Sequence, residues 1–202
     1  MQTVELEVID DPQAAVAVLD PVRCKLLAEL VEPASAAALA ERLGIPRQKV
    51  NYHLRTLEAH GLVKIAETRQ WGGLTERLMV ATAGAYLVSP VALGPIAPDP
   101  AKQRDRMSAS YLMSLAARAI REVGSLLNLA RRTEKRVATL SMDSEIRFRS
   151  PAERAAFSEE LTEAIHKLVA KYHDADSEQG RSHRLVIVAH PIPDSETAKE
   201  KS

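Results

Sequence analysis

A cluster of polar and basic side chains lies on one face of a predicted helix over residues 46–60. Apolar residues recur at Val50, Leu54 and Leu57, which is the period of a helix with one buried face. The outward positions are Arg47, Gln48, Lys49, Asn51, Tyr52, His53 and Arg55. Arginine can bind guanine O6 and N7 in the major groove, and asparagine or glutamine can bind adenine N6 and N7. This face is therefore predicted to contact DNA bases.

The segments around this helix predict a winged helix-turn-helix. Asp20-Pro21 is typical of a helix start, and Pro33 ends that helix. A short helix follows over residues 34–43, and a glycine at 44 stops it. After the glycine at 61 the pattern changes to two short strands, over residues 62–66 and 76–81. Residues 82–89 are predicted to add a short helix or an extended piece.

The turn between the two strands forms the predicted wing. It contains Trp71, Gly72 and Gly73, with Arg69 and Arg77 on its flanks. We expect these residues to reach phosphate or the minor groove. Ser35, at the start of the short helix, is a further predicted DNA contact. Residues 21–90 hold nine basic and six acidic residues, a balance of +3, although the whole chain has zero net charge.

The second half of the chain is predicted to be a separate domain. A proline-rich linker spans residues 91–100, and a long helix fits residues 101–132. Residues 137–149 alternate as a half-buried strand, a helix follows Ser150, and residues 185–189 are a continuous apolar strand. The predicted class is mainly α with small β. Its parts are a DNA-binding domain (1–90), the linker, a dimerisation and effector domain with a strand-helix-strand unit (101–194) and a flexible tail (195–202).

The long helix carries an apolar stripe that suits a dimer seam. The expected contacts of that seam are Leu112, Leu115, Ala119, Val123, Leu126 and Leu127. Met107, Tyr111 and Met113 lie near the start of the helix and are candidates to line an effector site. The alternative interpretation of both sets is packing within one chain. The role of the strand-helix-strand unit stays open among ligand sensing, dimer reinforcement and partner docking.

The composition excludes several classes of protein. The chain has 202 residues and one cysteine, which excludes a disulfide framework and a cysteine-rich zinc site within one chain. Its six histidines lack the spacing of a local chelate, so no metal site within one chain is expected, although one shared between subunits stays open. No catalytic motif or phosphate loop is present, and we expect neither an enzyme nor a cofactor. The acidic start does not resemble a signal peptide, and no apolar run predicts a membrane span, so a cytoplasmic protein is expected.

The sequence resembles ArsR-type winged-helix regulators over residues 11–90. The similarity is carried by PRQKVNYHLRTLEAHGLVK at residues 46–64, DPVRCKLLAEL at 20–30 and AALAERLGI at 37–45. It implies a homodimeric, operator-binding transcription regulator, by family habit a repressor, that responds to a small effector. Metal sensors of the family carry a cysteine pair on the short helix, whereas residues 35–43 here read SAAALAERL. A winged-helix module for protein–protein assembly, without specific DNA binding, is the alternative.

Overall fold

The structure is a computed structural model that describes residues 4–71, 73–133 and 136–193. It consists of two compact units, Met1–Val137 (unit 1) and Ala138–Ser202 (unit 2). The predicted linker does not separate them. Residues 90–102 form two 3₁₀ helices, η1 (Pro90–Ile96) and η2 (Pro100–Lys102), which contact the long helix that follows. The chain therefore divides about 40 residues later than the sequence predicts, because the prolines build packed turns rather than an extended spacer.

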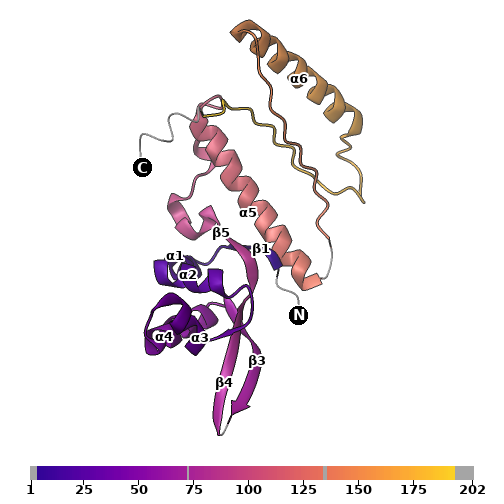
Figure 1. Cartoon of the computed structure of the whole chain (residues 1–202). Helices are drawn as coiled ribbons and strands as arrows, with labels where there is room; N and C mark the ends of the chain where they lie inside the picture. Colours follow the sequence, from indigo (N-terminus) through magenta and orange to yellow (C-terminus); the bar gives the residue numbers. More distant parts are fainter. Residues whose placement is uncertain (1–3, 72, 134–135, 194–202) are drawn as a thin grey trace. The chain divides into compact units, whose positions relative to one another are not determined.

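Four short helices lie in the N-terminal half of unit 1 (Figure 1). They are α1 (Pro12–Leu19), α2 (Pro21–Glu29), α3 (Ala36–Leu43) and α4 (Arg47–Ala59). The Asp20 carboxylate accepts hydrogen bonds from the N–H groups of Val22 and Arg23, both at 3.0 Å, and so caps α2. Gly44 ends α3 in the left-handed region, with φ of 64°. The local signals thus place α2, α3 and α4 close to the predicted ranges, although α2 ends four residues before Pro33.

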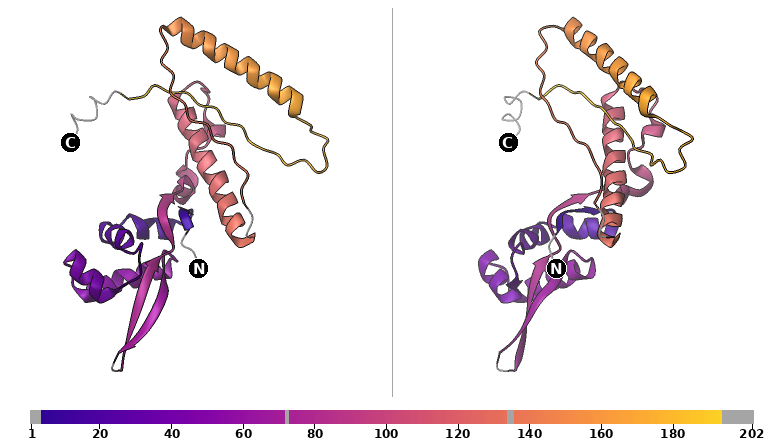
Figure 2. Two further views of the ribbon diagram at one scale, coloured as in Figure 1. Left: turned by 45° about the vertical axis from the view of Figure 1, so that its right-hand side comes forward. Right: turned by 90° about the vertical axis from the view of Figure 1, so that its right-hand side faces the viewer.

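A three-stranded antiparallel sheet follows the helices. Its order is β2 (Ala34–Ser35), β4 (Leu74–Ala81) and β3 (Val63–Trp71). The β3–β4 hairpin is longer than predicted, because its ladder continues from Val63↔Ala81 to Trp71↔Leu74. We call this hairpin the wing. Figure 2 shows from two further sides that it projects beyond the four short helices of unit 1.

A second, parallel sheet joins the start of unit 1 to the segment after the wing. It pairs β1 (Val4–Ile9) with β5 (Ala83–Val88). The Tyr86 hydroxyl donates to the Leu62 carbonyl at 2.7 Å and so ties β5 to the end of α4. The core lies between the helices and the sheets, with Leu26, Leu30, Leu39, Leu57 and Leu62 fully or almost fully buried.

The long helix α5 (Ala109–Thr133) completes unit 1 and begins later than the predicted residue 101. Its buried residues are small: Ser114, Ala117 and Gly124. An added Cβ at Gly124 would lie 2.7 Å from a Val8 methyl of β1, so the glycine permits this close approach. Arg131 donates to the Leu6 carbonyl at 2.9 Å. α5 therefore contacts β1 at Gly124 and at Arg131.

Unit 2 contains the helix α6 (Pro151–Tyr172) between two extended segments. The Ser150 hydroxyl caps α6 by accepting from the Glu153 N–H at 3.1 Å, as predicted. The predicted strands over residues 137–149 and 185–189 are wrong as regular strands, because neither described segment forms a strand ladder. Alternation gives a segment two faces, but only a neighbouring backbone makes it a strand.

The observed class is mainly α with small β, as predicted. Among the described residues, no helix is long and apolar enough to cross a membrane.

Candidate nucleic-acid interface

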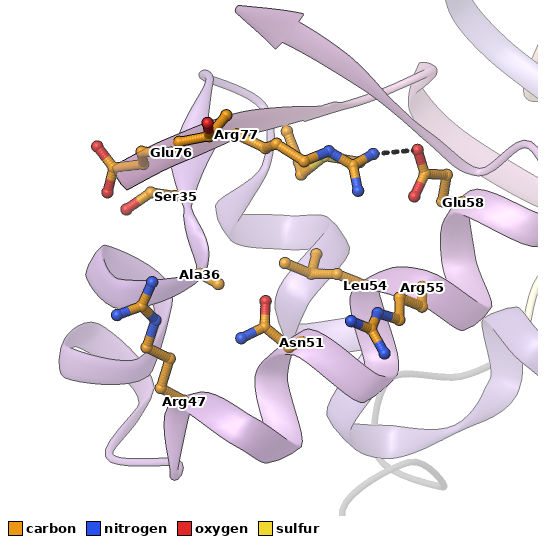
Figure 3. A pocket seen from close by; sticks show the side chains of 11 residues that line it. Ser35, Ala36, Arg47, Asn51, Leu54, Arg55, Glu58, Glu76 and Arg77 are labelled. Atoms are coloured by element: carbon orange, nitrogen blue, oxygen red, sulfur yellow. Dashed lines mark hydrogen bonds and ion pairs between the residues drawn. The ribbon is translucent and has the colours of Figure 1, made fainter. Parts of the chain in front are cut away.

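A groove of about 170 Å³ lies between α4 and the wing (Figure 3). It is lined by Ser35, Ala36, Arg47, Asn51, Leu54, Arg55, Glu58, Thr75, Glu76, Arg77 and Met79. The Asn51 amide points into the groove, with Arg47 and Arg55 on either side of it along α4. Arg77 reaches across from β4 toward α4. Helix and wing thus place three guanidinium groups and one amide around a single concave surface.

The apolar back of α4 fixes which side chains face this groove. Val50 and Leu57 are fully buried and Leu54 nearly so, as the sequence predicts. Arg47, Asn51 and Arg55 are spaced four residues apart, so they share one face of the helix. All three are exposed to solvent. The interior packing of α4 therefore sets the direction of its polar face.

Three further residues of the predicted set have exposed side chains, but they do not line the groove. These are Gln48, Lys49 and Tyr52. They follow Arg47 and Asn51 along the surface of α4 and extend the polar face of the helix beyond the groove. The exposed polar surface of α4 is therefore wider than the groove itself.

His53 is the exception, because its side chain is only 6% exposed. Neither ring nitrogen has a hydrogen-bond partner among the described residues, and the ring meets the Tyr52 ring edge-on at 5.3 Å. Burial lowers the pKa of His53, and the Asp20 carboxylate opposes that shift. The prediction that His53 points outward is therefore wrong. It follows Val50 by three residues and precedes Leu57 by four, a spacing that places it on the buried face.

Both predicted wing arginines form ion pairs with glutamates. The Arg77 guanidinium pairs with the Glu58 carboxylate of α4, which ties the wing to that helix. Arg69 pairs with Glu67 of its own strand at 2.9 Å, and this hydrogen bond lowers the pKa of Glu67. The sequence prediction missed Glu58, although it follows Arg55 by three residues and so lies on the same face of α4.

The other predicted DNA contacts have mixed outcomes. Ser35 is buried, caps α3 through a 3.3 Å hydrogen bond from the Ala38 N–H, and lines the groove. Gly73 adopts a positive φ of 85° at the wing turn. Trp71 ends β3, but its side chain and Gly72 lie outside the described residues.

The residues proposed for dimer and effector contacts lie along α5 and just before it. Leu112, Leu115, Ala119 and Leu127 are half-buried, whereas Val123 and Leu126 are exposed. Gly124, which lies against Val8 of β1, is not one of these residues. Tyr111 is half-buried, but Met107 is 95% exposed and Met113 is also exposed. The two methionines are therefore not enclosed.

Residues 18–66 match the family model described as a helix-turn-helix domain. This part of the chain is a helix-turn-helix domain. The match covers the segment from the end of α1 to the first residues of β3, so it includes α3, α4 and the turn between them. In such domains the second helix of the motif lies in the major groove, with its N-terminal residues at the base edges. The domain therefore supports a role in DNA binding.

Two solved structures are similar to parts of the chain. NolR from Sinorhizobium fredii is 26% identical, over 36% of this chain and 68% of that one, with a TM-score of 0.30. The transcriptional repressor BigR from Xylella fastidiosa is 18% identical, over 61% of this chain and 86% of that one, with a TM-score of 0.28. None of the curated proteins compared with the chain matches it.

Proposed function

We propose that the chain is a sequence-specific DNA-binding transcription regulator that inserts α4 into the major groove. The observation that carries this proposal is the placement of Arg47, Asn51 and Arg55 on one exposed face of the second helix of a helix-turn-helix domain. Arg47 and Asn51 lie in the first half of α4, where base contacts of such helices concentrate. Their side chains supply donors for guanine and a paired donor and acceptor for adenine.

The wing supplies contacts that do not depend on sequence. Arg69 and Arg77 are both exposed on the hairpin beside α4. Exposed guanidinium groups next to a base-reading helix are suited to bind phosphate oxygens, which fix the position of a protein on the duplex. Loss of either contact lowers affinity for all sequences alike, because phosphates carry no base identity.

The regulator acts as a homodimer in this proposal. One recognition helix reads only a short half-site, and two helices on one face of the duplex must lie roughly 34–36 Å apart. The apolar stripe of α5, with Leu126 47% exposed, supplies a seam that two copies can share. The similarity to ArsR-type regulators favours repression, by occlusion of a promoter. A small effector that binds one dimer geometry better than another then controls release.

The proposal is tested by selecting bound fragments from a random DNA pool with the full chain and sequencing them. On the selected site, Arg47→Ala and Asn51→Ala should each weaken binding by about 1–3 kcal/mol, and relax the preference at one base pair. Lys25→Ala removes an exposed lysine of α2 that does not line the groove, and it should leave affinity nearly unchanged.

Two results would contradict the proposal. Enrichment of no motif, with no salt-dependent affinity for DNA, would favour the alternative of a protein–protein assembly module. Unchanged affinity in both α4 variants, with the fold intact, would exclude α4 as the reading helix.

A further inference from the structure

Unit 2 exposes apolar side chains that a stable fold has to cover. None of its described residues is buried, although α6 is 22 residues long. Large exposed apolar residues occur on both extended segments: Leu140, Met142, Ile146, Leu185, Ile187, Val188 and Ile192. One helix with two segments that form no strand ladder is marginal in water. These surfaces therefore fit a protein partner.

The segment over residues 139–149 has two chemically distinct faces. Phe148 contacts Phe157 of α6, with ring centroids 5.4 Å apart. In an extended chain every second residue shares a face, so Leu140, Met142 and Ile146 share the face of Phe148. The opposite face carries Asp143, Glu145, Arg147 and Arg149. This is the pattern of a strand with one face against a helix and one charged face.

The order of charges makes this face complementary to itself. Along this face the two acidic residues come before the two basic ones, and neighbouring charges are two residues apart in the sequence. If two copies run antiparallel with Ile146 at the centre, Glu145 lies opposite Arg147 of the second copy. Asp143 then lies opposite Arg149, and the two-fold axis doubles both pairs. Opposite charges in directly facing positions stabilise a strand pair.

Other alignments of two copies lose this match. A shift by two positions places Glu145 opposite Glu145 of the second copy in one direction, and Arg147 opposite Arg147 of the second copy in the other. Like charges in facing positions are destabilising. A parallel, in-register alignment places every charge opposite its own copy. In the single chain, no described residue forms an ion pair with Asp143, Glu145 or Arg147. Arg149 pairs with Glu153 at 2.7 Å, so the central Glu145–Arg147 pairs decide the register.

We propose that residues 139–149 pair with the same residues of a second copy as antiparallel strands centred on Ile146. The pairing satisfies backbone groups that lack a ladder in one chain, and it creates one sheet with an α6 helix from each copy over its apolar face. This strand pairing is the contact between the two copies of unit 2 in the homodimer proposed above. The pairing itself does not depend on DNA binding.

Cysteine cross-linking in the full chain tests the register. With Cys24→Ser as background, Ile146→Cys places two thiols in facing positions, with Cβ atoms about 4.5–5.5 Å apart, close to the disulfide range. Met142→Cys is the matched control, since it lies on the same face but about 26 Å from its copy in this register. Mild oxidation should cross-link the Ile146 variant and leave the Met142 variant monomeric on a non-reducing gel. Equal cross-linking of the two, or none of the Ile146 variant, overturns the proposal.

Charge reversal tests the pairing chemistry. Glu145→Arg and Arg147→Glu each create two like-charge pairs across the axis, so each should raise the dimer dissociation constant by roughly 2- to 30-fold. A mixture of the two variants restores every pair and should form the heterodimer in preference to either homodimer. Unchanged dissociation constants, or no preference in the mixture, contradict the proposal.

The results separate this inference from the proposed function. An Ile146 cross-link in a chain that binds no specific DNA leaves the strand pairing standing and removes the regulator proposal. Specific DNA binding without the Ile146 cross-link leaves the regulator proposal standing and removes the strand pairing.

Discussion

The ion pair between Glu58 and Arg77 predicts that loss of the Glu58 charge strengthens DNA binding instead of weakening it. Both side chains are partly exposed, at 36% and 43%. If Arg77 contacts a phosphate, it has to share or leave the Glu58 carboxylate, which also repels DNA. Removing that carboxylate by Glu58→Gln should therefore tighten binding rather than weaken it.

The size of the gain follows from the exposure of the pair. Ion pairs between exposed side chains contribute about 0.2–1 kcal/mol, because water and salt screen them. Release of Arg77 should therefore improve DNA affinity by at most about fivefold. Arg77→Gln should weaken binding and flatten the slope of log affinity against log salt by about 0.9 units, the contribution of one phosphate.

The assay is fluorescence anisotropy of a labelled operator between about 50 and 200 mM salt, the range over which phosphate contacts change affinity strongly. Glu41→Gln is the control, since it makes the same charge change on an exposed part of α3 that does not line the groove. The gain from Glu58→Gln should shrink in the Arg77→Gln background. Weaker binding of Glu58→Gln itself would refute the reasoning, and would show that Glu58 holds Arg77 in its binding position.

Three further predictions concern stability and assembly. Gly124→Ala should destabilise unit 1 by up to about 2 kcal/mol in urea unfolding, since overpacking against Val8 outweighs the gain in helix propensity, and Val8→Ala should cancel the loss. Because burial lowers the folded-state pKa of His53, the unfolded chain binds more protons. The free energy of unfolding should therefore fall as the pH drops below about 6.5, by at most about 1.4 kcal/mol per unit, and His53→Leu should remove that contribution. Leu115→Glu combined with Leu126→Glu should shift the chain toward monomer in sedimentation at micromolar concentration, and an unchanged dimer would place the seam elsewhere.

The parts of the fold that depend on local signals could be predicted from the sequence. The structure places α4 at Arg47–Ala59, inside the limits set by Pro46 and Gly61. Its buried residues Val50, Leu54 and Leu57 also match, because a helix repeats its environment every three to four residues. The groove-facing positions follow from the same period. The burial of His53 follows from it too, although a polar side chain at that position suggests exposure.

The parts that depend on distant partners could not be predicted. β1 pairs with β5 across almost 80 residues, and nothing in Val4–Ile9 alone identifies that partner. The Glu58–Arg77 pair also joins two elements whose distance only the fold defines. In unit 2 the residues over 137–149 do alternate, but alternation does not supply a backbone to pair with.

α5 shows why apolar periodicity alone misidentifies the buried face of a helix. Its prominent stripe consists of large apolar residues, yet the buried residues of the helix are Ser114, Ala117 and Gly124, and Gly124 lies against Val8 of β1. Close approach of a helix to a strand requires small side chains, so the intramolecular contact uses the residues that a hydrophobicity pattern ranks lowest. Val123, Leu126 and Leu129 remain exposed. The exposed part of the stripe is free within the chain and is therefore the stronger candidate for contact with another copy, and the charged face over residues 139–149 satisfies the same criterion independently.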